Sequence, residues 1–154
     1  MPINQDEADG ERPVDRDLDD RQADRAPTTR VTPLRYAGIP ADARRLVDAR
    51  RGLERWAVAA GIAPSVVDDI VLAGYEAMAN AAEHAYRLRP GTLDLLATSE
   101  DGEVVVVVRD RGDWRPPPAD PGDRGRGLLM IRSTSEADID SGPDGTTVRM
   151  RWRR

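Results

Sequence analysis

Residues Leu72 to Tyr86 read LAGYEAMANAAEHAY, and the spacing of the polar residues in this stretch indicates the fold. Because successive residues of an α-helix advance by about 100°, Glu76, Asn80 and His84 fall within one narrow stripe. Small or apolar residues take the opposite side of the same helix: Val67, Gly74, Met78, Ala81 and Ala85. The pattern predicts a helix from Pro64 to near Arg87–Pro90 that buries one face and presents polar groups from the other.

The polar stripe combines a carboxylate, a carboxamide and an imidazole, which are side chains that bind cations or accept protons. A solvated helix face more usually carries Lys, Arg and Glu. A row of this kind can nevertheless be the wet side of an ordinary surface helix. The stripe alone leaves both interpretations open, so the rest of the chain must decide between them.

The amino-acid composition excludes several kinds of site and reaction. The chain has 154 residues, a net charge of -5 and no cysteine, which fits one domain with a tail and excludes disulfides, cysteine-ligated metals and a thiol nucleophile. It has no lysine, so neither a P-loop lysine nor a Schiff base is available. The acidic balance argues against direct nucleic-acid binding. No stretch resembles a membrane span or a signal peptide, so we expect no membrane segment and a soluble, cytoplasmic protein.

The order of the expected elements indicates an α+β fold. Residues 1–29 are rich in Asp, Arg and Pro and are expected to form a disordered tail before a domain over residues 30–154. Besides the central helix, we expect helices over Ala43–Ala60 and Leu128–Ile131. The expected strands are Arg30–Tyr36, Thr92–Thr98, Glu103–Arg109, Ala137–Asp140 and Thr146–Trp152. This grouping predicts a two-layer sandwich with the helices on one face of a mostly antiparallel, mixed sheet.

Three local features place the strands. Pro33 limits the first strand to a sheet edge or a bulge, because proline cannot donate to a ladder. The Asp101-Gly102 pair is typical of a tight hairpin turn. The valine run in Glu103–Arg109 shows no polar alternation, which predicts a central strand covered on both faces.

Two glycine-containing turns follow this sheet. Asp110 ends the valine strand, and Gly112 lets the backbone approach a flat ligand, so the carboxylate can accept a hydrogen bond from an exocyclic amine such as that of adenine. The Gly125-Arg126-Gly127 turn opens a helix, where free N–H groups favour a phosphate, although a plain structural turn is the alternative. For a phosphate group, Asn80 could supply an oxygen ligand to Mg²⁺ and Glu76 could act as a general base.

Taken together, these motifs resemble the four boxes of the GHKL ATP-binding superfamily, which has the Bergerat fold. The boxes are an ExxxN helix (Glu76, Asn80), a DxG turn (Asp110, Gly112), a GxG turn (Gly125, Gly127) and a GT strand (Gly145, Thr146). The resemblance covers about Arg30 to Arg154. Within the superfamily, the compact length and the sequence from Glu76 to Tyr86 most resemble the RsbW-type anti-sigma-factor kinases.

This resemblance implies a set of roles. ATP and Mg²⁺ are the expected cofactors, with Asn80 as the Mg²⁺ ligand and Glu76 as the catalytic base. Asp110 would contact adenine with Thr146 beside it, and the Gly125-Arg126-Gly127 turn would contact the phosphates. Spacing from the helix box also places Arg50 as a phosphate-facing arginine. Independently of the resemblance, His84 is expected to make a structural hydrogen bond within the helix pair, with contact to the nucleotide as the alternative.

The resemblance also implies partners. Kinases of this type phosphorylate serine or threonine on an anti-anti-sigma protein with a STAS domain, and they bind an RNA polymerase sigma factor, so both are candidate partners. Because these kinases are often dimers, a homodimer is included among the expected assemblies.

Two departures from the family pattern leave alternatives open. Trp114 replaces the second glycine of the usual DxGxG turn, and the loop Arg115 to Asp123 is rich in proline. The first hypothesis is a protein serine/threonine kinase. The second is an anti-sigma or adaptor module that acts only by occlusion, with weak or absent ATP turnover. A third is an ATP-binding domain that serves a larger signalling assembly.

Overall fold

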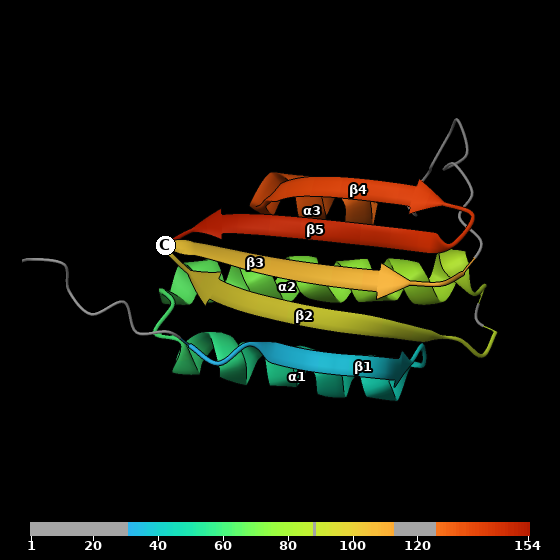
Figure 1. Ribbon diagram of the computed structural model, residues 1–154, viewed down its shortest axis with the longest axis horizontal. Coiled ribbons are helices and arrows are strands. Elements are labelled where there is room, and N and C mark those ends of the chain that lie inside the picture. The colour runs from blue at the N-terminus through green and yellow to red at the C-terminus, as the bar shows by residue number, and fades with distance from the viewer. Residues whose placement is uncertain (1–30, 88, 113–125) are drawn as a thin grey trace, which may run out of the picture.

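The computed structural model describes residues 31–87, 89–112 and 126–154. The predicted tail over residues 1–29, Gly125 and the loop that contains Trp114 lie outside the described residues. Within those residues, five strands form one sheet, and the helices pack on one of its faces (Figure 1). None of the helices in these segments is long and apolar enough to cross a membrane.

All the strand pairs of the sheet are antiparallel, in the order β1-β2-β3-β5-β4. The strands are β1 (Leu34–Pro40), β2 (Thr92–Glu100), β3 (Glu103–Asp110), β4 (Glu136–Gly142) and β5 (Gly145–Arg153). The helices are α1 (Ala43–Ala59), α2 (Pro64–Asn80), the π-helical turn η1 (Ala81–Ala85) and α3 (Arg126–Thr134). This architecture confirms the predicted α+β sandwich, and the described strands include no parallel pair of the kind a mixed sheet would add.

β1 is an edge strand, as Pro33 led us to expect, but it lies further along the chain than the predicted range 30–36. Because Pro33 has no N–H for a ladder, regular pairing begins after it, at Leu34. The register shifts around Gly38, whose φ is +67°. This bulge lets the strand continue through Pro40 before α1 begins.

β3 lies at the centre of the sheet, but it is covered on one face only. Val104, Val106 and Val108 are buried beneath the helices, whereas Val105 and Val107 are partly exposed on the open face. The prediction of coverage on both faces was therefore wrong. A run of five valines hides the alternation that a half-buried strand normally shows in its sequence.

The core lies between the sheet and the helix layer. α1 and α2 pack side by side, and α3 packs beside α2 (Figure 1). Side chains from both layers are fully buried there: Leu53, Ile70, Met78, Leu93, Leu95, Ile131 and Met150. Asp42 begins α1 by accepting a hydrogen bond from the Arg45 N–H at 3.0 Å, which satisfies one free N–H of the first turn.

The central helix does not remain α-helical to its predicted end. It is α-helical to Asn80 and then makes one π-helical turn, in which the Tyr86 N–H donates to the Ala81 carbonyl oxygen at 3.2 Å. This wider turn changes the direction of His84 relative to Glu76 and Asn80 from the one that an ideal α-helix predicts. His84 is exposed and makes no side-chain hydrogen bond to the described residues, so the expected structural bond is not present among them.

Candidate functional site

Asp110 ends β3 at one end of the sheet and is almost fully buried, with 5% of its surface exposed. Its Oδ1 atom accepts hydrogen bonds from the Gly112 N–H at 3.0 Å and the Thr146 N–H at 3.3 Å. Burial raises the pKa of the Asp110 carboxyl, and these two hydrogen bonds oppose that rise. Within the described residues both bonds use Oδ1, so Oδ2 is the atom with which Asp110 could accept a bond from a ligand.

Gly145 brings the start of β5 against Asp110. Its φ of +113° is a conformation that side chains rarely allow, and a Cβ at this position would collide with the backbone of Asp110 and Arg111. Because there is no Cβ, Thr146 comes close enough for its N–H to reach the Asp110 carboxylate. The GT pair and the DxG turn therefore form one unit in space.

Gly112 brings the same turn against the end of the central helix. A Cβ on Gly112 would lie 2.5 Å from the Ala85 carbonyl oxygen and 2.6 Å from the Ala85 Cβ. The π-helical turn and the DxG turn are thus in direct contact. The turn from Asp110 to Gly112 therefore lies between β5, which contacts Asp110, and this helix end, which contacts Gly112.

Gly127 brings the entrance of α3 against the polar face of α2. α3 begins at Arg126, and a Cβ on Gly127 would lie 2.9 Å from Glu76 Oε2 and 3.0 Å from Asn80 Oδ1. Glu76 and Asn80 are both only partly buried. The structure therefore brings the carboxylate and the carboxamide of the polar stripe to the N-terminal end of a helix, where N–H groups without helical partners favour anions.

Arg50 lies apart from this group. Its guanidinium carbon is 5.9 Å from the centre of the Tyr75 ring, and it lines a groove between α1 and α2 with Glu54, Asp68 and Leu72. No hydrogen bond or ion pair among the described residues joins Arg50 to Glu76, Asn80 or Asp110. In this structure its immediate partner is the aromatic ring.

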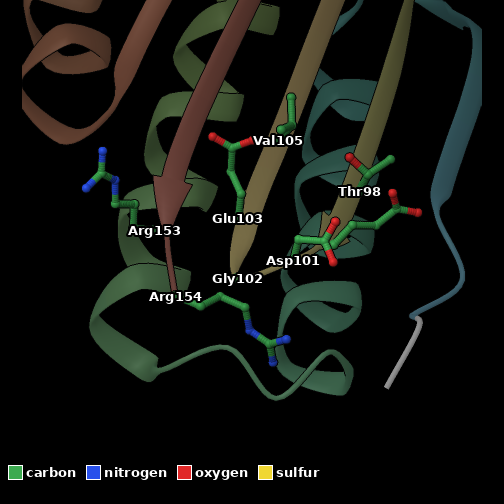
Figure 2. Close-up of a pocket in the computed structure, with 8 residues that line it drawn as sticks. Thr98, Asp101, Gly102, Glu103, Val105, Arg153 and Arg154 are labelled. Atoms are coloured by element: carbon green, nitrogen blue, oxygen red, sulfur yellow. The ribbon is translucent and has the colours of Figure 1, made fainter. Parts of the chain in front are cut away.

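A hollow of about 600 Å³ lies at the opposite end of the sheet, around the turn between β2 and β3 (Figure 2). It is lined by charged side chains, including Glu100, Asp101, Glu103 and Arg153, and contains none of the predicted site residues. Arg154 lies at its edge and donates to the Ala60 carbonyl oxygen at 2.6 Å, which ties the end of β5 to α1.

Sequence reasoning missed Tyr86 as part of the site. Its hydroxyl accepts a hydrogen bond from the Arg111 N–H at 2.9 Å, directly beside Asp110. The hydroxyl also donates to the Thr92 carbonyl oxygen, and because both partners are backbone groups, the sequence does not reveal them. The described segments contain no group of three or more His, Cys, Asp or Glu side chains that could hold a metal ion.

Comparison with solved structures supports the same grouping of elements. The structure of the RsbU and RsbW domains of a Mycobacterium tuberculosis protein aligns with a TM-score of 0.64 and 31% identity over 79% of this chain. This chain spans about a third of that longer chain, 32%. A chain of the SiaB–SiaC complex from Pseudomonas aeruginosa aligns with a TM-score of 0.57 and 16% identity over 77% of this chain and 88% of that one, a likeness that shows the fold alone.

Comparison with protein families gives a match over most of the domain. The family described as "Histidine kinase-like ATPase domain" matches residues 39–152, which include Glu76, Asn80, Asp110 and both glycine-containing turns. This match and the RsbW-domain neighbour confirm the resemblance to the GHKL superfamily and its RsbW-type members. The chain belongs to the histidine kinase-like ATPase domain family.

Proposed function

We propose that this protein is an ATP- and Mg²⁺-dependent protein serine/threonine kinase that acts on an anti-anti-sigma partner with a STAS domain. The family implies ATP binding, and the likeness to an RsbW domain supports a partner-switching role. One observation carries the proposal: the entrance of α3 packs directly against Glu76 and Asn80 through Gly127. A helix N-terminus, a carboxylate and a carboxamide oxygen thus meet where a triphosphate could be held and transferred.

The adenine end of the site is assigned to the turn after β3. Asp110 would accept a hydrogen bond from the exocyclic amine of adenine through Oδ2, while Oδ1 stays bonded to the Gly112 and Thr146 N–H groups. Because those bonds fix the carboxylate before any ligand arrives, little ordering is required on binding. Gly112 and Thr146 would line the same end of the nucleotide.

The phosphate end is assigned to the polar face of α2. The described residues fit a Mg²⁺ ion that is coordinated partly by protein and partly by phosphate oxygens. Asn80 offers one neutral oxygen ligand, and the described residues around Asn80 do not supply a complete set of ligands for the ion. When bound, Mg²⁺ would neutralise charge on the phosphates. Glu76 lies one helical turn before Asn80 and would accept the proton of the attacking serine or threonine hydroxyl. Gly125, Arg126 and Gly127 would contact the phosphates, and Arg50 is proposed as a further phosphate contact that would have to leave Tyr75.

We further propose that the protein acts in the cytoplasm and regulates transcription that depends on a sigma factor, with a sigma factor as second partner and a homodimer as its assembly. These assignments come from the type of kinase it resembles. Pull-down from the source cells with the intact protein, followed by identification of the captured proteins, would test them, and recovery of neither partner class would count against them.

The kinase proposal is tested by substituting Asn80 and Glu76. We expect Asn80→Ala to lose labelled phosphate transfer from ATP to the captured partner, and Glu76→Gln to lose transfer while still binding ATP with Mg²⁺. Glu83→Gln is the matched control, because Glu83 lies on the same helix end but is exposed and away from Gly127. Circular dichroism would verify folding. Transfer at the wild-type rate by Asn80→Ala would overturn the Mg²⁺ assignment.

A specific feature favours the binding module as a second candidate function. The turn reads Asp110-Arg111-Gly112-Asp113-Trp114, with a bulky ring at the position of the second family glycine. Calorimetry separates the two proposals. Absence of ATP binding by the wild-type protein would favour the module and refute the kinase, and ATP binding without transfer would favour an occluding protein that uses nucleotide only as a ligand.

A further inference from the structure

The hydroxyl group of Tyr86 joins three elements at the end of the sheet. It donates a hydrogen bond to the Thr92 carbonyl oxygen at 2.5 Å, at the start of β2. It accepts a hydrogen bond from the Arg111 N–H at 2.9 Å, in the turn after β3. Arg111 stands between Asp110 and Gly112, so this second bond fixes the backbone of the turn that carries the buried carboxylate.

The π-helical turn delivers Tyr86 to this position. The Tyr86 N–H bonds to the carbonyl of Ala81, five residues earlier, rather than to one four residues earlier. A single π-helical turn adds a residue to the helix and changes the direction of every side chain after it. Arg87 then takes a φ of +50°, which ends the helix immediately after the tyrosine.

The chain also leaves space for the aromatic ring. A Cβ at Gly91 would overlap the Tyr86 ring and lie 2.5 Å from its Cε1 atom, so only glycine fits beside it. The ring is therefore confined between the helix end and the start of β2. Confinement of the ring holds the hydroxyl in place, because a tyrosine side chain has only two rotatable bonds before its rigid ring.

A second contact holds the same turn from the open face of the sheet. The Arg111 guanidinium bonds to Asp94 Oδ2 at 2.5 Å, and Asp94 Oδ1 accepts the Gly38 N–H at 2.8 Å. This contact uses the flexible side chain of Arg111, which is about half exposed, 52%. It anchors the turn loosely. Among the described residues, the Tyr86 hydroxyl makes the hydrogen bond that fixes the position of the Arg111 backbone.

We propose that Tyr86 is a positioning residue for base recognition. Its hydroxyl holds the Asp110–Gly112 turn in the position in which the Asp110 carboxylate can accept a hydrogen bond from an exocyclic amine. It thereby sets the preference for adenine over a purine without that amine. The inference rests on the proposed function, because it takes Asp110 to be the adenine contact. It adds a residue that does not touch the nucleotide and acts through the turn.

The test compares two diphosphates that differ at this one group. ADP carries the exocyclic amine and IDP carries a carbonyl oxygen in its place, and neither is consumed during calorimetry. Tyr86→Phe removes both hydrogen bonds of the hydroxyl, and we expect loss of the one to the Arg111 N–H to lower the ratio of ADP affinity to IDP affinity roughly 3- to 10-fold. IDP affinity should stay close to that of the wild type. Tyr36→Phe is the matched control, because the hydroxyl of Tyr36 lies beside Gly52 in the α1 region and makes no hydrogen bond to the described residues.

A second measurement needs no nucleotide. Amide hydrogen exchange in the free protein should be faster at Arg111 in Tyr86→Phe than in the wild type, and unchanged at the centre of β3. An unchanged ADP to IDP ratio, or an equal loss of affinity for both nucleotides, would overturn the inference. Unchanged exchange at Arg111 would overturn it as well. If the wild-type protein binds ADP and IDP equally, the adenine assignment of Asp110 fails first and this inference falls with it.

Discussion

Replacing Gly145 with alanine should separate β5 from the turn that holds Asp110. An added Cβ would overlap the Asp110 carbonyl oxygen and would lie 2.7 Å from the Arg111 Cα and 2.8 Å from the Asp110 carbonyl carbon. All of these are backbone atoms, so no side-chain rotation relieves the collision. Either β5 shifts relative to β3, or the Gly142–Gly145 end of the hairpin opens and the Thr146 hydrogen bond to Asp110 is lost.

Two other glycines allow the loss of stability in Gly145→Ala to be divided into a backbone contribution and a packing contribution. Gly102 has a φ of +79°, but no atom lies within 4 Å of the place that a Cβ would take, so Gly102→Ala carries only the cost of a left-handed backbone, roughly 1–2 kcal/mol. Gly142 has free space and an ordinary φ, so Gly142→Ala should be close to neutral. Gly145→Ala adds overpacking, roughly 1–3 kcal/mol, to the backbone cost, which gives a total of about 2–5 kcal/mol.

Urea unfolding of the three variants and the wild type measures these differences directly. The dependence of the unfolding free energy on urea concentration should be the same in all the variants, so that differences in the midpoint urea concentration report differences in stability alone. Gly145→Ala should also bind ADP more weakly than Gly102→Ala, because only the first disturbs the Asp110 carboxylate. If Gly145→Ala is no less stable than Gly102→Ala, the close approach of β5 to Asp110 is not what requires glycine at this position.

Two further predictions concern the proposed phosphate site beside Gly127 and the open face of the sheet. Gly127→Ala should keep or raise stability by up to about 1 kcal/mol, because alanine favours a helix and the atoms it meets are the ends of flexible side chains, yet phosphate transfer should fall as Glu76 and Asn80 move aside. Full transfer by this variant would contradict the site geometry. Asp94 has a lowered pKa, chiefly because the Gly38 N–H donates to it and then because Arg111 does. Ionised Asp94 therefore contributes to the free energy of unfolding above its unfolded pKa near 4, and this contribution is lost as the pH falls through the folded pKa. Between about pH 6 and about pH 3 the wild type should lose more stability than Asp94→Asn. Equal losses would refute this.

The sequence predicted the element order well because the signals are local. Helical spacing identified α1 and α2, and the Asp101-Gly102 pair identified the turn between β2 and β3, where φ is +50° and +79°. The π-helical turn could not be predicted, because AAEHA has nothing that distinguishes it from an α-helical turn. The same limit applies to Tyr86, whose partners are backbone groups brought near by the fold. The roles of Glu76, Asn80 and Asp110 remain predictions, although the structure places Glu76 and Asn80 together at the entrance of α3.

The structure shows a second role for the glycines of the motifs, which is to allow close contact between one motif and another. Sequence reasoning explains them one at a time, by a turn or by the approach of a ligand. In the fold, three of them mark a contact between two motifs: Gly112 with the end of the central helix, Gly127 with Glu76 and Asn80, and Gly145 with Asp110. Gly112 and Gly145 are therefore required by packing before any nucleotide binds, whereas the absence of a side chain at Gly127 leaves Glu76 and Asn80 in place at some cost in helix stability. A loss of activity at one of these positions can come from packing or from ligand contact, and stability and binding must be measured on the same variant to separate the two causes. Gly127 is the most informative position, because there the two effects are expected to have opposite signs.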